Sequence, residues 1–211
     1  MAGPRQRLLD AAVDYVAANG ISDVSLRQLA AALDTSHRML VYHFGSKGGL
    51  LVEVVRAVEE RQRRALAELA ADPELSPGDQ ARQIWRRLTD PALAPHERLF
   101  FEVYGQALQG RPHTTSLLDG IVDNWLEPLT RLAIQHGTPA RQARAQARLG
   151  VAVIRGLLLD LLATGDRQGV DAAMEVFITM YETATSGAPR PVRRARRSAR
   201  TTSEEVSHGT Q

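Results

Sequence analysis

Residues 25–47 read SLRQLAAALDTSHRMLVYHFGSK, and this stretch decides the fold of the N-terminal part of the chain. Ser25 and Ser36 each precede an apolar run with helical spacing, where a serine caps the helix by accepting a backbone N–H. Three alanines at 30–32 let two helices cross closely, and Asp34 tolerates the left-handed backbone of a tight turn. The stretch therefore predicts a helix, a short turn, a second helix and the start of another.

The second of these helices has an apolar and a polar face. Leu40 and Phe44 are four residues apart and face the core. The side chains that flank this stripe or point outward are His37, Arg38, Met39, Val41 and Tyr42. No acidic residue occurs between residues 36 and 47. A short helix whose exposed face is rich in donors and free of carboxylates suits the major groove of DNA.

Apolar residues recur at helical spacing along the rest of the chain, and no segment alternates with period two for long. We predict an all-α fold of about nine helices without strands. The expected helices cover residues 4–19, 25–33, 36–44, 46–70, 79–89, 96–109, 114–136, 138–164 and 170–185. Pro128 removes a backbone donor inside the seventh helix and should kink or split it.

Residues 186–211 are rich in Pro, Gly, Ser, Thr and Arg and lack apolar periodicity, which predicts a disordered tail. The tail holds six arginines and two glutamates, a formal charge of +4, whereas residues 1–185 carry −2. The chain has 25 arginines beside one lysine, which fits a high-GC coding bias. The arginine excess alone is therefore weak evidence for nucleic-acid binding.

The composition, with 211 residues, 44% hydrophobic and 24% charged, is that of a soluble chain with one or two domains. Arg155 and Asp160 interrupt the most apolar stretch, so no segment reaches the ~20 apolar residues of a membrane span. The absence of cysteine excludes disulfides, thiolate metal sites and a cysteine nucleophile. Asp10 and Asp14 lie where a signal peptide would be apolar, so we expect a cytoplasmic protein with no membrane partner.

Four motifs lie within residues 8–51: LLDAA at 8–12, NG at 19–20, VSLRQLA at 24–30 and LVYHFGSK at 40–47. In these motifs the sequence resembles the tetracycline-repressor (TetR) family of bacterial transcription regulators. Beyond residue 51 only helix number and chain length agree. The resemblance implies a three-helix helix-turn-helix DNA-binding domain at 1–50, a helical ligand-binding and dimerisation domain at 51–185, and the Arg-rich tail at 186–211.

The resemblance also implies which residues contact DNA. The DNA-binding candidates are Ser25, Arg27, Ser36, His37, Arg38, Met39, Tyr42, His43 and Lys47. Ser25 and Lys47 would contact phosphates, and the central residues would contact bases or the DNA backbone. His43 would lie against the DNA backbone or, alternatively, serve as a structural histidine.

The sequence departs from the family pattern at several positions. Val41 stands where the family usually has tyrosine, and adjacent Tyr42 can take over that phosphate contact. Asp34 stands where glycine is usual. Gly48 and Gly49 stand where an acid and an alanine are common; each weakens a helix by about 0.5–1 kcal/mol relative to alanine, yet permits close approach to a phosphate.

The C-terminal part contains aromatic and polar side chains suited to a small-molecule cavity. The candidate ligand-binding residues are Trp85, Phe101, Tyr104, Trp125, Asp160 and Phe177. Plain core packing is the alternative for each of them, and a solvent-facing position is the alternative for Asp160.

The last two expected helices predict a homodimer. Their stripes, with spacings of three and four residues, are Ala143, Ala147, Gly150, Ile154, Leu157 and Leu161, then Val170, Ala173, Phe177, Met180 and Ala184. Such stripes suit a four-helix interface formed by two copies of the pair. Burial inside one subunit is the alternative.

An enzyme has no support in the sequence. A phosphate-binding loop, a dinucleotide fingerprint, a nucleophile elbow and an HExxH motif are all missing. The one Glu-x-x-His, at 205–208, lies in the tail, and His96, His113 and His136 lie far apart near expected helix ends, where we expect solvated positions. We therefore predict no catalytic residues, cofactor or metal.

The function predicted from these observations is a repressor that a small-molecule effector releases from a palindromic operator in double-stranded DNA. The alternative is an architectural protein with a basic tail that binds DNA with little specificity and has no effector. Selection from random DNA separates the two, because only the first enriches a short palindrome.

Overall fold

The computed structural model describes residues 3–20, 24–70, 72 and 74–186 of the chain. In these ranges the chain forms nine α-helices, two 3-10 helices and no strand, which confirms the predicted all-α fold. The elements are α1 (Pro4–Asn19), α2 (Leu26–Ala32), α3 (His37–Phe44), α4 (Lys47–Ala70), α5 (Pro77–Leu88), η1 (Pro91–Leu93), α6 (Ala94–Leu108), η2 (Thr115–Leu118), α7 (Asp123–Gln135), α8 (Ala140–Thr164) and α9 (Arg167–Ser186). The predicted tail, apart from its first residue, lies outside the described residues.

Local signals in the sequence explain several helix ends. Ser76 precedes α5, and its Oγ accepts the backbone N–H of Asp79 at 3.1 Å, while Pro77 occupies the first helical position. Helix α8 ends at Gly165, which has φ 72° and donates its N–H to the Leu161 carbonyl at 2.9 Å. This left-handed C-terminal residue favours glycine and separates α8 from α9.

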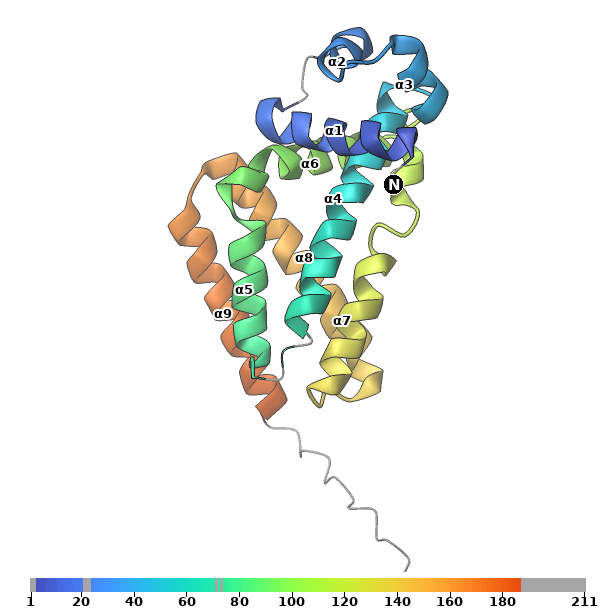
Figure 1. Cartoon of the computed structure of the whole chain (residues 1–211). Helices are drawn as coiled ribbons and strands as arrows, with labels where there is room; N and C mark the ends of the chain where they lie inside the picture. The colour runs from blue at the N-terminus through green and yellow to red at the C-terminus, as the bar shows by residue number, and fades with distance from the viewer. Residues whose placement is uncertain (1–2, 21–23, 71, 73, 187–211) are drawn as a thin grey trace, which may run out of the picture.

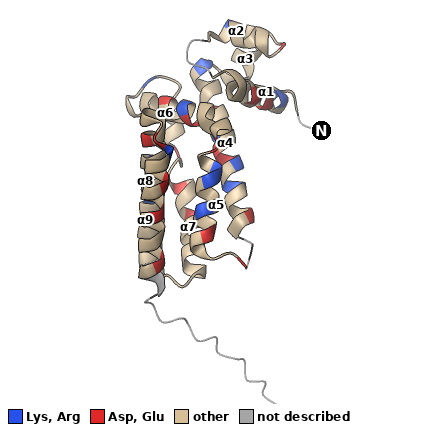
Figure 2. Cartoon of the chain, turned by 90° about the vertical axis from the view of Figure 1, so that its left-hand side faces the viewer, with Lys and Arg blue, Asp and Glu red and all other residues tan. Residues whose placement is uncertain are grey.

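The helices form two parts joined by α4: a head, made of α1 to α3, and a body, made of α5 to α9. Helices α2 and α3 lie at one end of the molecule, and the C-terminal end of α9 lies at the other (Figures 1 and 2). Helix α4 starts beside α3 and runs down into the body, while α1 packs against both α4 and α6. No helix in the described ranges is long and apolar enough to cross a bilayer.

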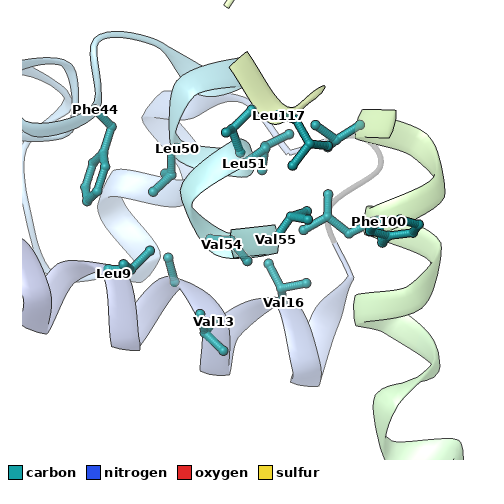
Figure 3. Close-up of a cluster of buried hydrophobic side chains, with 14 of the residues drawn as sticks. Leu9, Val13, Val16, Phe44, Leu50, Leu51, Val54, Val55, Phe100 and Leu117 are labelled. Carbon is teal, nitrogen blue, oxygen red and sulfur yellow. The ribbon is translucent and has the colours of Figure 1, made fainter. Parts of the chain in front are cut away.

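The largest hydrophobic core joins the head to the body (Figure 3). Val13 and Val16 of α1 pack with Leu50 and Val54 of α4, and all four are almost fully buried. The same cluster continues through Leu51 and Val55 to Phe100, Val103 and Leu117 of α6 and η2. Burial of each large apolar side chain contributes about 1.5–3 kcal/mol. The expected domain boundary after residue 50 therefore falls inside α4 and inside one continuous core.

Two smaller clusters hold the body helices together. Trp85 and Leu88 of α5 pack with Leu158 of α8 and with Met174 and Ile178 of α9. The other cluster joins α7 to α8 through Leu126, Ala147 and Val151.

The helix predicted over 114–136 is divided differently from the expectation. It consists of η2 and α7, and the break lies at residues 119–122, where Gly120 has φ 76°. Of the two outcomes predicted for Pro128, a kink or a split, the split is wrong, because α7 runs through Pro128. A proline inside a helix removes one backbone hydrogen bond, whereas a left-handed glycine turns the whole chain out of the helix.

The stripe predicted for the dimer on α8 faces the inside of its own chain. Ala143 and Ala147 are buried, and Ile154, Leu157 and Leu161 pack against the cluster around Trp85. The alternative of burial within one subunit therefore holds for this stripe, because α7 and α9 cover it. The α9 stripe is mixed: Val170 is buried, Phe177 is partly buried, and Ala173 and Met180 are exposed.

Candidate DNA-binding surface and small-molecule cavities

Helices α2 and α3 form the predicted helix-turn-helix. The Ser25 Oγ accepts the Gln28 N–H at 3.2 Å, and the Gln28 Oε1 accepts the Ser25 N–H at 2.9 Å, which forms a capping box. The turn contains Asp34 with φ 50°, as predicted for a left-handed residue. Ser36 then caps α3, since its Oγ accepts the Met39 N–H at 3.1 Å.

Helix α3 presents the predicted outward face. Leu40 and Phe44 are buried in the core, whereas the Tyr42 side chain is 79% exposed. The other candidates on the exposed surface of α2 and α3 are Ser25, Arg27, Ser36, His37, Arg38 and Met39. His43 differs from them, because its Nε2 is buried without a hydrogen-bond partner among the described residues and its ring contacts Tyr42 and Phe44. This position favours the structural alternative for His43.

The cations of this surface, of which Arg27 and Arg38 are exposed and Lys47 is partly buried, are not neutralised by carboxylates. Within the part of the chain that the structure describes, Arg27, Arg38 and Lys47 form no ion pair. Arg5 differs, because it pairs with Glu53 and lies over the Phe44 ring. Unpaired cations beside a protruding helix suit contacts with a phosphate backbone.

The glycines after Lys47 have structural roles that the sequence did not indicate. A Cβ on Gly49 would lie 2.2 Å from the Phe44 carbonyl oxygen, so only glycine lets α4 start this close to α3. A Cβ on Gly48 would lie 3.3 Å from the Cβ of His113, which places the start of α4 against the loop between α6 and η2. The glycines thus serve close packing inside the protein.

The first cavity in the body has a volume of about 120 Å³ and lies between α5, α7, α8 and α9. Its wall is mainly apolar and includes Phe177. Polar groups come from His136 and Gln80, whose Nε2 and Oε1 are 3.2 Å apart. Burial lowers the pKa of His136, which favours its neutral form. No Asp, Glu, Lys or Arg lines this cavity within the described residues.

The second cavity, of about 70 Å³, is bounded by helices α4 to α8. Its wall contains Phe101 and Trp125, both predicted as ligand-binding residues, together with Phe100. It also contains the charged side chains of Glu59 and Arg155 and of a second acid, Glu97. Ile84, Leu129 and Ile154 line both cavities, so the two are neighbours.

The two carboxylates of the second cavity have perturbed proton affinities. Burial, together with the charge of Glu59, raises the pKa of Glu97 to about 7, and Arg155 only partly opposes this rise. Burial also raises the pKa of Glu59, against a hydrogen bond from the Trp125 Nε1–H and the charges of Arg155 and Arg63, each 3.9 Å away. Arg155 itself donates to the Ile121 carbonyl at 2.7 Å.

The structure does not bring the other predicted ligand residues to either cavity. Trp85 is buried and donates its indole N–H to Asp171 Oδ1 at 2.6 Å. Tyr104 stacks on Phe100 with ring centroids 5.4 Å apart. Asp160 is exposed on α8, as its alternative stated.

Sequence reasoning missed the charged residues of the second cavity and misplaced two histidines. His96 is buried, and its Nε2–H donates to the Val13 carbonyl at 3.1 Å, whereas His136 lines the first cavity, so the expected solvated positions are wrong for both. Arg155 carried an available signal, because an arginine that interrupts an otherwise apolar stretch of a helix needs a partner.

The comparisons with known proteins agree with this geometry. Residues 8–54 match the model of a family described as bacterial regulatory proteins, tetR family. The chain is 26% identical over 172 residues to the HTH-type transcriptional regulator SrpR of Pseudomonas putida, with 78% of each chain covered.

Two solved structures extend the similarity over the body. The multidrug binding protein EbrR, complexed with imidazole, is 30% identical over 90% of this chain and 93% of its own, with a TM-score of 0.60. A member of the TetR family from Streptomyces coelicolor A3 is 29% identical over 84% of this chain and 98% of its own, also with a TM-score of 0.60. The matched family and SrpR are transcriptional regulators and not enzymes.

Proposed function

The chain belongs to the TetR family of bacterial transcriptional regulators, and on that basis we propose that it is a repressor that binds a palindromic operator as a homodimer and leaves it when a small molecule binds. The observation that carries the proposal is the outward face of α3, where Arg38 and Tyr42 are exposed beside unpaired cations. Residues 1–50 read the DNA, and residues 51–185 bind the ligand and dimerise. Its place of action is the cytoplasm, where bacterial DNA is transcribed.

The dimer interface in this proposal is the outer face of α8 and α9. The exposed apolar or small residues there recur every three or four positions: Ala145, Leu149, Ala152, Gly156, Leu159 and Ala163 on α8, and Gly169, Ala173, Val176 and Met180 on α9. The four largest of them are 51–66% exposed in the single chain. A second copy would bury them in a four-helix contact, and the small residues allow close approach of the helices.

Helix α4 is the proposed link between ligand and DNA. It begins at Lys47 in the head and lines the second cavity through Glu59 and Leu66. In the dimer, the two heads would be spaced differently in the DNA-bound and the released state. A ligand in the body can shift the balance between these states only if it binds one of them more tightly, typically by ~1–3 kcal/mol. The EbrR structures with imidazole and with proflavin support small-molecule binding in a body of this kind.

Selection of binding sites from random DNA by the purified protein tests the proposal. We expect a palindrome whose half-site centres lie ~34 Å apart or a multiple of it. Arg38→Ala and Tyr42→Ala should each cost ~1–3 kcal/mol on that site, whereas Lys47→Ala should weaken all sequences about equally. Enrichment of no palindrome, with similar affinity for all DNA, would instead support the architectural alternative.

A further inference from the structure

Glu97 is the acid of the second cavity that no ion pair compensates within the part of the chain that the structure describes. Its wall carries two acids, Glu59 and Glu97, and one base, Arg155. Arg155 is already engaged by Glu59 at 3.9 Å and by the Ile121 carbonyl. Among the described residues, Glu97 has neither a hydrogen-bond nor an ion-pair partner. Glu59 is already compensated, because Arg63 and Arg155 each lie 3.9 Å from its Oε2, so an ionised Glu97 is left without a direct counter-charge among the described residues.

The remaining wall is aromatic and aliphatic. Phe101 and Trp125 lie in it, and the indole N–H of Trp125 is occupied by Glu59. Glu97 also lines an outer depression beside Asp90, Arg98 and Leu162, so its side chain borders both hollows. A ligand in the second cavity therefore contacts both this carboxylate and an apolar wall.

We infer that the second cavity selects an effector that is an organic cation, with its charged group at Glu97 and its apolar body against Phe101 and Trp125. This inference rests on the proposed function and names the chemical class of its effector. A cation compensates the free carboxylate, and aromatic faces attract cations in addition. Among the described residues the first cavity has no charged wall residue, so it can receive only an uncharged extension of the ligand, past Ile84, Leu129 and Ile154.

Proton release accompanies this binding, because a bound cation holds Glu97 ionised. The groups that face Glu97 are Glu59 of α4 and Arg155 of α8, while Asp90, Arg98 and Arg167 surround the outer depression. A carboxyl with a pKa of about 7 is mostly protonated at about pH 6 and mostly ionised at about pH 8, so cation affinity should rise about tenfold between them.

The test compares benzamidine with benzamide, which share size and shape but differ in charge. Calorimetry on the full chain without DNA should show benzamidine bound at least about tenfold more tightly than benzamide at about pH 8. Glu97→Gln should remove that preference and the pH dependence of benzamidine affinity. The control is Glu102→Gln, which changes an exposed acid on the same helix and should leave both intact.

Equal binding of the two probes, no binding of benzamidine at millimolar concentration, or a preference that survives in Glu97→Gln would each overturn the inference. Thermal unfolding of both variants verifies that they are folded. Because these measurements contain no DNA, their failure is distinct from a failure to select a palindrome, which would overturn the proposed function.

Discussion

Glu97 should make the folded protein less stable as the pH rises. Its pKa is raised from 4.5 to about 7 in the folded chain, mainly by burial, whereas the unfolded chain exposes it to water. Between these values the folded state binds the proton more tightly, so the free energy of unfolding falls with increasing pH. The stabilising contribution of the Glu97 carboxyl to the folded state is fully present below about pH 4.5 and is lost once the pH passes about 7.

The size of the effect follows from the same two values. A difference from 4.5 to about 7, at about 1.4 kcal/mol per pH unit, corresponds to about 3.5 kcal/mol at most. In Glu97→Gln the side chain stays neutral at every pH. The variant should therefore match the parent near pH 4.5 and exceed its free energy of unfolding by about 3 kcal/mol near pH 8.

Urea denaturation over a series of pH values measures this difference. Protein concentration must be held constant, because a dimer gains stability with concentration. Glu102→Gln serves as the reference for other titrating groups, since Glu102 is exposed on the same helix. A difference between Glu97→Gln and the parent that stays constant from acid to alkaline pH would refute the assigned burial of Glu97.

Three further predictions concern packing, assembly and the tail. Gly49→Ala should destabilise the chain by about 2 kcal/mol or more through its clash with the Phe44 carbonyl, whereas Gly105→Ala, with open space around its Cβ, should stabilise it by about 0.5–1 kcal/mol in thermal unfolding. Leu159→Glu should give a monomer in analytical ultracentrifugation, because a charge would be buried in the proposed dimer face; an unchanged dimer would exclude that face. Truncation after Thr185 removes all six tail arginines and should make the salt dependence of DNA binding shallower if the tail contacts phosphates, while an unchanged slope would assign the tail to solvent.

The head was predictable because its signals are local. Each of these signals joins residues that are only a few positions apart, so both partners can be recognised in one short stretch of sequence. The signals are the caps at Ser25 and Ser36, the turn residue Asp34 and the two-residue apolar stripe of α3. The exposed DNA-binding candidates follow from the same short periodicity.

The cavities were not predictable in this way, because their walls come from distant helices. Glu59 sits in a run of charged residues on α4 that is typical of a solvated face, and Glu97 in the first turn of α6 is typical of a residue that favours the helix dipole. Only the packing of α4, α6 and α8 places both acids on one cavity wall. Likewise, the periodicity of α8 gives two apolar stripes, and only the position of α7 and α9 decides which one is covered.

The shared core of α1, α4 and α6 limits how new DNA specificities can be obtained by exchanging parts between regulators. Helix α1 packs against α6, and the Val13 carbonyl of α1 accepts a hydrogen bond from the buried His96 N–H of α6. If residues 1–50 were transplanted into another regulator, α1 would have to pack against an α6 of different sequence. Helices α2 and α3 enter that core mainly through Leu29, Leu40 and Phe44. The exchangeable part is therefore the segment from Ser25 to Phe44, smaller than the DNA-binding domain, and a chimaera made at residue 50 would have to bring α6 with it to remain folded.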